Sequence, residues 1–220
     1  MLNALNTEIN TTNYYSKEKI IDVKNLSFKY NKTKEILTNI NFSINCGDFA
    51  CIIGKNGCGK STLLRLILGI IKSHESNIQI NTNYISYIPQ SLNFNKSFPI
   101  TVKEFLKFNT KELNIPYANA QHLIYKYNLE NCLNSLIGDL SGGQLQKLIL
   151  VRALLKKTDL LIVDEPTNNL DEESKYTIYD NLKELNDKNM TILVVEHNKA
   201  LLNNYINKIF MIEEGTLHAI

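Results

Sequence analysis

Residues 54–62, GKNGCGKST, constrain the fold of this chain more than any other part of its sequence. They match the pattern G-x-x-x-x-G-K-[ST] and lie between FACII, a predicted buried strand, and STLLRLILGI, a predicted apolar helix. Glycines let the backbone turn its N–H groups inward around an anion, and a helix that begins near Lys60 adds its positive dipole end. A glycine-rich turn without a ligand is the alternative, but the flanking strand and helix favour a phosphate site. The predicted phosphate-binding residues are Gly54, Asn56, Gly57, Cys58, Gly59, Lys60, Ser61 and Thr62.

Two acidic residues end a second apolar run and are candidates for binding a metal ion and activating water at the phosphate site. In LLIVDEP, Asp164 and Glu165 follow four apolar residues. Catalysis of phosphoryl transfer is mostly positioning and charge neutralisation. We expect Lys60 to reach the β- and γ-phosphates, and Ser61 and Asp164 to serve Mg²⁺, the latter through a coordinated water. Glu165 is placed to polarise the attacking water. Acidic residues at strand ends also cap helices, which is the alternative for this pair.

The apolar pattern along the chain predicts an α/β fold. Residues 20–24, 26–30 and 36–44 alternate apolar and polar positions, as half-buried strands do. Three further runs, FACII, LLIVD and TILVV, are continuously apolar, which is typical of strands covered on both faces. The last two are followed by polar, helix-compatible sequence, and this alternation predicts a parallel sheet.

Helical spacing in TVKEFLKFN and YANAQHLIYKYN predicts a helical subdomain inserted at about residues 91–150. Residues 1–18 are rich in Asn and Thr without apolar periodicity, and we interpret them as a flexible N-terminal tail. Residues 19–220 are expected to form a single domain. A hydrophobic fraction of 44% and a charged fraction of 21% exclude wholesale disorder.

The composition also excludes several functions. Lys and Arg total 24 against 22 for Asp and Glu, a balance that argues against a nucleic-acid partner. The four cysteines and four histidines are scattered, without the spacing of a structural zinc site. Signal-peptide and membrane-spanning patterns are both missing from the sequence. We therefore expect a soluble protein of a reducing compartment.

The segment LSGGQ, residues 140–144, predicts a second anion-binding helix start. A serine and two glycines precede the apolar helix LQKLILVRALL, so the N–H groups at its beginning point toward a ligand. Taken alone, the segment is an N-capping serine followed by flexible glycines. The candidate residues are Ser141, Gly142, Gly143 and Gln144.

Together these motifs resemble the nucleotide-binding subunit of an ATP-binding cassette (ABC) transporter, from about Lys19 to the C-terminus. GKNGCGKST is similar to the Walker A loop, LLIVDEP to the Walker B strand, and LSGGQ to the family signature. The resemblance implies a P-loop NTPase core with a parallel sheet, an N-terminal antiparallel β part and an inserted helical subdomain. It also implies ATP as substrate, Mg²⁺ as cofactor and an ATPase activity coupled to transport.

Four further residues take their expected roles from this resemblance. Tyr30 is similar to the aromatic residue that stacks on adenine, and Gln90, in YIPQ, to the Q-loop glutamine that senses Mg²⁺. Asp171, in Asn169-Leu170-Asp171, resembles the D-loop residue, and His197 the switch histidine that contacts the γ-phosphate. Each has a structural alternative: an edge-strand aromatic, a polar loop residue, a helix cap, and a surface or core histidine. The implied catalytic residues are Lys60, Gln90, Glu165 and His197, and the implied Mg²⁺ site consists of Ser61, Gln90 and Asp164.

The resemblance further implies a head-to-tail homodimer, in which MgATP lies between the phosphate loop of one copy and the signature of the other. It implies integral membrane permease subunits and an extracytoplasmic metal-binding protein in the same system. The expected location is peripheral, at the cytoplasmic face of the inner (plasma) membrane.

One segment bears on the transported substrate. Residues 97–102, SFPITV, follow the Q-loop and are similar to the corresponding stretch of zinc and manganese importers. The alternative is that Pro99 and Thr101 merely begin a helix, with Thr101 as N-cap and Glu104 completing a capping box. The resemblance favours import of a divalent metal, zinc ahead of manganese. The other open functions are an ATPase subunit of a different ABC importer or exporter, and a soluble ABC ATPase outside transport.

Overall fold

The computed structural model describes residues 18–30, 35–73, 77–90, 99–168, 170–197, 202 and 204–220. The predicted tail, apart from Glu18, lies outside these residues. So do Asn169 and residues 91–98 of the predicted helical insertion.

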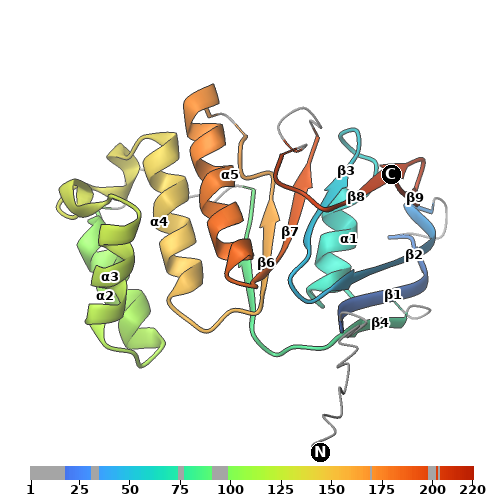
Figure 1. Ribbon diagram of the computed structural model, residues 1–220, viewed down its shortest axis with the longest axis horizontal. Helices are drawn as coiled ribbons and strands as arrows, with labels where there is room; N and C mark the ends of the chain where they lie inside the picture. Colours follow the sequence, from blue (N-terminus) through green and yellow to red (C-terminus); the bar gives the residue numbers. More distant parts are fainter. Residues whose placement is uncertain are drawn as a thin grey trace, which may run out of the picture.

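A six-stranded sheet forms the centre of the molecule, in the order β5-β6-β7-β3-β8-β9 (Figure 1). Its first five strands are parallel, and β9 pairs antiparallel with β8 at one edge. The three continuously apolar runs form adjacent strands in which every residue is buried. The strands are β3 (Phe49–Ile53), β5 (Ile85–Ile88), β6 (Leu160–Asp164), β7 (Thr191–Glu196), β8 (Lys208–Glu213) and β9 (Thr216–Ala219).

A separate antiparallel sheet, in the order β2-β1-β4, packs beside this core. Its strands are β1 (Lys19–Phe28), β2 (Leu37–Asn45) and β4 (Asn77–Ile80). The predicted strands 20–24 and 26–30 join into the single strand β1. Asn25, between them, has a φ of 50°, in the left-handed region that Asn tolerates, and the pairing of β1 with β2 shifts register there.

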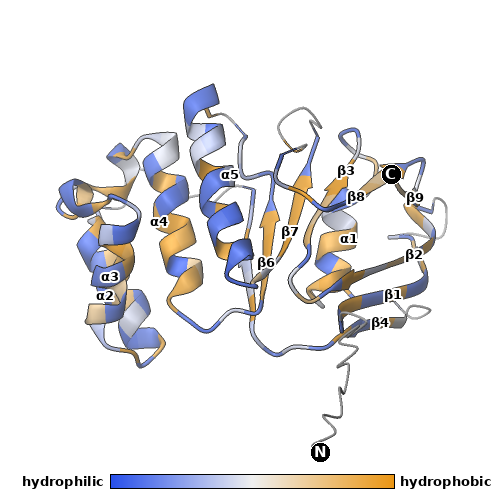
Figure 2. Ribbon diagram, viewed as in Figure 1, coloured by the Kyte–Doolittle hydropathy of each residue, from blue (hydrophilic) through white to orange (hydrophobic). Residues whose placement is uncertain are grey.

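Helices cover both faces of the central sheet (Figures 1 and 2). Helix α1 and the antiparallel sheet share one apolar core with one face of the strands, and α4 and α5 share the other core with the opposite face. Helices α2 and α3 lie beyond α4, at the end of the molecule away from the antiparallel sheet (Figure 1). The helices are α1 (Lys60–Ile67), α2 (Val102–Glu112), α3 (Tyr117–Lys126), η1 (Glu130–Cys132), η2 (Ile137–Asp139), α4 (Gly142–Leu154) and α5 (Glu172–Asp187). The predicted fold class, with its parallel core, antiparallel β part and helical insert, is confirmed.

Candidate active site

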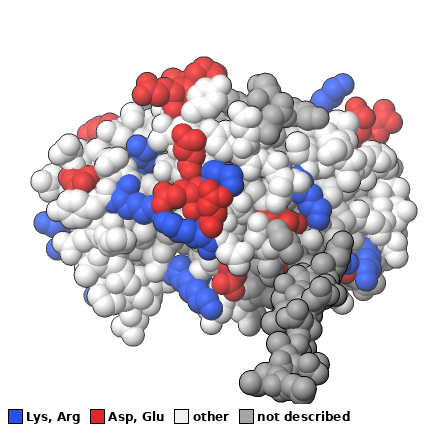
Figure 3. Space-filling view, viewed as in Figure 1, with Lys and Arg blue, Asp and Glu red and all other residues white. Residues whose placement is uncertain are grey.

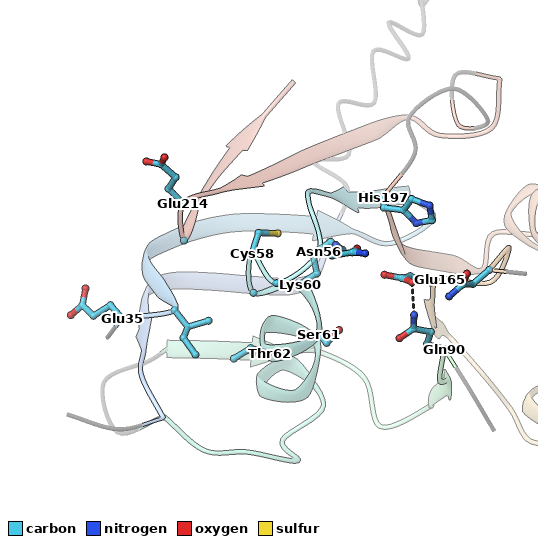
Figure 4. A pocket seen from close by; sticks show the side chains of 15 residues that line it. Glu35, Asn56, Cys58, Lys60, Ser61, Thr62, Gln90, Glu165, His197 and Glu214 are labelled. Atoms are coloured by element: carbon cyan, nitrogen blue, oxygen red, sulfur yellow. Dashed lines mark hydrogen bonds between the residues drawn. The ribbon is translucent and has the colours of Figure 1, made fainter. Parts of the chain in front are cut away.

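A pocket of about 810 Å³ opens at the carboxyl ends of the parallel strands, where ligands bind in open α/β sheets (Figure 4). Each of the five parallel strands is followed by residues that line it. β3 is followed by the phosphate loop, and the other four by Gln90, Glu165, His197 and Glu214. The pocket-lining residues are Glu35, Ile36, Asn56, Gly57, Cys58, Gly59, Lys60, Ser61, Thr62, Gln90, Glu165, Asn168, His197, Glu214 and Gly215.

The phosphate loop has the geometry of an anion cradle. Gly59 has a φ of 109°, and a Cβ on it would lie 2.8 Å from Cδ2 of Leu37, so this position requires glycine. Within the described residues no side chain caps α1, which leaves its first N–H groups available to a ligand. The Nζ of Lys60 donates hydrogen bonds to the carbonyl oxygens of Gly54 at 2.8 Å and Lys55 at 3.0 Å. Gly54, a predicted phosphate-binding residue, is not among the residues that line the pocket.

Asp164, the last residue of β6, carries a buried and incompletely paired carboxylate. Its Oδ1 has no hydrogen-bond partner among the described residues, and its Oδ2 accepts only a long 3.5 Å contact from the Tyr87 hydroxyl. Burial raises the pKa of Asp164, and the adjacent Glu165 carboxylate raises that pKa further. A buried oxygen without a donor suits a cation, so this donor set fits a hard metal ion such as Mg²⁺.

Glu165 points into the pocket because the backbone turns sharply there. It has a φ of 46°, and its N–H donates to the Val195 carbonyl at 2.9 Å, which ties the turn to β7. The Glu165 Oε2 accepts a 2.5 Å hydrogen bond from Nε2 of Gln90. Figure 4 shows these two side chains facing one another, with His197 on the same side of the phosphate loop. The fold therefore brings the four predicted catalytic residues, Lys60 included, to one pocket.

Tyr30 lies beside this pocket and lines a neighbouring hollow. Its ring is half exposed and stands edge-to-face against Phe28, with ring centroids 4.9 Å apart. Its hydroxyl lies 3.4 Å from the Thr62 Oγ1 at the beginning of α1. The predicted adenine-stacking residue is thus next to the phosphate loop, outside the pocket that contains it.

The signature residues Ser141, Gly143 and Gln144 line a separate hollow of about 440 Å³, which shares no lining residue with the phosphate pocket and does not include Gly142. Ser141 caps α4, since the Gln144 N–H donates to its Oγ and the Gln144 side chain accepts from the Ser141 N–H. Gly142 and Gly143 are the first residues of this helix rather than a loop before it. Asp171 lines the same hollow and caps α5, and hydrogen bonds from Ser174 lower the pKa of its carboxyl.

Some pocket-lining residues have no counterpart in the motif analysis. Glu35 and Glu214 lie at the end of the pocket away from Gln90 (Figure 4). The β8–β9 turn reaches this position because the Thr38 N–H donates to the Gly215 carbonyl at 2.8 Å, a contact between distant parts of the sequence. Asn168 could have been predicted from the sequence, because it directly precedes the predicted D-loop.

Comparison with known proteins shows which family the chain belongs to. A family model described as ABC transporter matches residues 37–168, more than half of the chain. The chain belongs to the ABC transporter family. It is the ATP-hydrolysing, ATP-binding subunit of such a transporter, and ABC subunits of this kind act with membrane permease components. In the part of the chain that the structure describes, no helix combines the length and the apolar character needed to cross a membrane.

Individual ABC proteins match over most of the chain. The zinc uptake system ATP-binding protein ZurA of Listeria innocua is 37% identical over 215 residues, covering 89% of this chain and 83% of ZurA. The zinc import ATP-binding protein ZnuC of Wigglesworthia glossinidia brevipalpis is 35% identical, covering 91% of this chain and 85% of ZnuC. Among solved structures, an ATP-binding cassette of an ABC transporter in its ADP conformation matches with a TM-score of 0.79 and 27% identity. That match covers 91% of this chain and 89% of the cassette.

Proposed function

We propose that this ABC subunit energises the import of a divalent metal ion, with zinc as the first candidate and manganese as the alternative. The observation that carries the substrate is its identity of 35–37%, over about nine-tenths of the chain, with subunits named for zinc uptake and zinc import. The segment that begins α2 is a second, weaker support. Thr101 and Glu104 form the capping box there, so this segment also has a structural reason for its sequence.

The phosphate loop and Lys60 bind the phosphates of ATP. The inward N–H groups of the loop and the uncapped start of α1 receive the β- and γ-phosphates. Lys60 is nearly buried and already held by two carbonyl oxygens, so its ammonium is preorganised beside the γ-phosphate. Tyr30 supplies a ring for adenine at the neighbouring hollow.

Ser61, Gln90 and Asp164 would hold Mg²⁺, with the unpaired Oδ1 of Asp164 as the feature that fits it. When bound, this ion neutralises charge on the β- and γ-phosphate oxygens. Ser61 reaches the site from the first turn of α1 and Gln90 from the end of β5.

Glu165 acts as the general base. Its carboxylate takes a proton from the attacking water as the water oxygen bonds to the γ-phosphorus and the bond from that phosphorus to the β-phosphate oxygen breaks, releasing ADP and phosphate. Gln90 holds the carboxylate in place through its 2.5 Å hydrogen bond. His197, whose side chain is half exposed at the pocket, contacts the γ-phosphate.

Two copies of the chain are needed to complete each site. Ser141, Gly143 and Asp171 line a hollow separate from the phosphate pocket, so within one chain they lie outside the ATP site. A second copy in head-to-tail orientation brings its signature over the phosphates. Charge stabilisation supplied in trans is worth about 10³–10⁵ in rate in other phosphoryl-transfer enzymes.

The partners follow from the family and the proposed substrate. Membrane permease subunits bind beside Gln90 and the helical insertion, and an extracytoplasmic metal-binding protein delivers the ion. The subunit is then peripheral at the cytoplasmic face of the membrane. On the face seen in Figure 3, basic and acidic side chains are interspersed, which suits a protein partner better than a nucleic acid.

Metal uptake by whole cells tests the proposal. Cells that lack the subunit are complemented with the wild-type chain, with Lys60→Ala, or with Lys183→Ala, which removes a partly exposed lysine of α5. We expect the wild-type chain and Lys183→Ala to restore uptake of radioactive zinc, and Lys60→Ala to restore none. If manganese uptake depends on the subunit and zinc uptake does not, the transported metal is manganese. Independence of both metals from the subunit contradicts metal import.

A further inference from the structure

Glu196, the last residue of β7, is a buried carboxylate that the mechanism above does not use. Only 1% of the residue is exposed. Its Oε1 accepts two hydrogen bonds from buried hydroxyls, at 2.7 Å from Thr167 and at 3.0 Å from Tyr179. These donors come from the loop after β6 and from α5, so the carboxylate joins three elements of the core.

The second oxygen of Glu196 is directed toward His197, a residue that lines the candidate active site. Its Oε2 lies 3.4 Å from the backbone N of His197 and 3.7 Å from Nδ1 of the His197 ring. At 3.7 Å the attraction to the ring is electrostatic rather than a hydrogen bond. Across the described ranges of the chain, the His197 ring is the basic group that lies within 4.0 Å of this carboxylate.

The contacts of Glu196 lead to two residues of the ATP pocket. His197 follows it directly in sequence, and Asn168 follows its partner Thr167; both line the pocket. An ionised carboxylate is costly to bury, so a residue that only filled space here would be better served by an apolar side chain. The two hydroxyl donors fix the carboxylate through Oε1, so that its Oε2 stays toward His197, whose side chain is half exposed.

We propose that Glu196 is a positioning residue for ATP hydrolysis, which holds the His197 ring toward the γ-phosphate and anchors the loop that begins at Thr167. Because the Glu196 carboxylate lies on the Nδ1 side of the ring, Nε2 is on the opposite side and is left to face the pocket. This inference rests on the proposed role of His197 in ATP hydrolysis. It adds a link between the ends of β6 and β7, so that the histidine and the loop move together.

A double-mutant cycle on the full-length chain tests this link. Glu196→Gln keeps the shape of the side chain and an oxygen for the two hydroxyls, but presents an amide group to Nδ1. We measure kcat and KM for ATP in the wild type, Glu196→Gln, His197→Ala and the double variant. Tyr179→Phe, which removes one donor to Glu196, is compared with Tyr205→Phe, which removes a surface hydrogen bond to the carboxylate of Asp180.

We expect Glu196→Gln to lower kcat by about 10- to 100-fold, the range known for residues that orient a metal-binding histidine, with KM changed less than about twofold. In the His197→Ala background the same change should lower kcat by a smaller factor than in the wild type, because only the contact with the Thr167 loop remains to be lost. Tyr179→Phe should lower kcat, and Tyr205→Phe should leave it unchanged.

Two results overturn the proposal: wild-type kcat in Glu196→Gln, or a double variant that shows the full product of the two single effects. If Glu196→Gln does not fold, Thr167→Val against Thr167→Ser, which restores the hydroxyl, gives the same test through the other contact. A wild-type kcat in His197→Ala is a different outcome. It removes His197 from the proposed mechanism, and the inference about Glu196 falls with it.

Discussion

Replacing Glu165 with glutamine should separate ATP binding from ATP hydrolysis. The substitution keeps the size of the side chain and removes its charge. The amide cannot take a proton from water, and its hydrogen bond with Gln90 loses the charge assistance of the present 2.5 Å contact. The phosphate loop, by contrast, is untouched.

The size of the effect follows from these contacts. A positioned general base contributes about 10²–10⁴ in rate, which corresponds to about 2.7–5.4 kcal/mol of transition-state stabilisation. ATP binding should not weaken, because the Glu165 charge raises the pKa of Asp164 and opposes its ionised form. Without that charge the Asp164 carboxylate is more readily available to a cation. Bound ATP should therefore persist, together with the dimer that it closes.

Steady-state ATPase assays and gel filtration with ATP measure both consequences. We expect Glu165→Gln to hydrolyse ATP at least about 100-fold more slowly than the wild type and to elute as a dimer with ATP. Glu130→Gln, in the helical insertion far from the pocket lining, is the matched control and should behave as wild type. Elution of Glu165→Gln only as a monomer with ATP, or hydrolysis within about threefold of the wild type, would refute the reasoning.

Three further variants probe the same account. Lys60→Ala should abolish nucleotide binding in calorimetry, because it removes the preorganised ammonium of the phosphate loop; unchanged affinity would refute the phosphate-site assignment. Asp164→Asn should raise the melting temperature at pH about 7.5 and change it little at pH about 4. The pKa of Asp164 is raised in the folded state, so the ionised carboxylate destabilises the fold at pH values above that pKa. This destabilisation disappears as the pH falls toward 3.8, the pKa in the unfolded chain. An equal change of melting temperature at both pH values would contradict this reasoning. Thr101→Ala should cost about 1 kcal/mol by removing the N-cap of α2 and lower the melting temperature by about 2–4 °C, whereas Thr101→Ser should not.

The parts of this site that the sequence predicts are those encoded by contiguous residues. The phosphate loop, the end of β6 and the signature each lie within a short motif, and the three apolar runs mark the centre of the sheet. The capping box of Thr101 and Glu104 is confirmed for the same reason, since its two members are three residues apart. Local spacing is enough to specify such features because their geometry is set by one turn of chain.

Features made by distant contacts were not predicted. Glu35 and Glu214 reach the pocket only because the β8–β9 turn packs against the start of β2. Glu196 ends an apolar run, where a carboxylate ordinarily reaches solvent, and hydrogen bonds from the hydroxyls of Thr167 and Tyr179 offset the cost of its burial. That the signature and the phosphate loop lie in separate hollows was implied by the family resemblance and not by the spacing of the residues.

The central claim, an ATPase subunit that works with a membrane permease in metal import, is tested most directly by a tagged pull-down from gently solubilised cells. Retained proteins are identified by mass spectrometry. The account predicts a multi-spanning membrane protein, present at one copy per cassette, whose own sequence then bears on the transported metal. Recovery of ribosomal or DNA-repair proteins without a membrane subunit would contradict the claim.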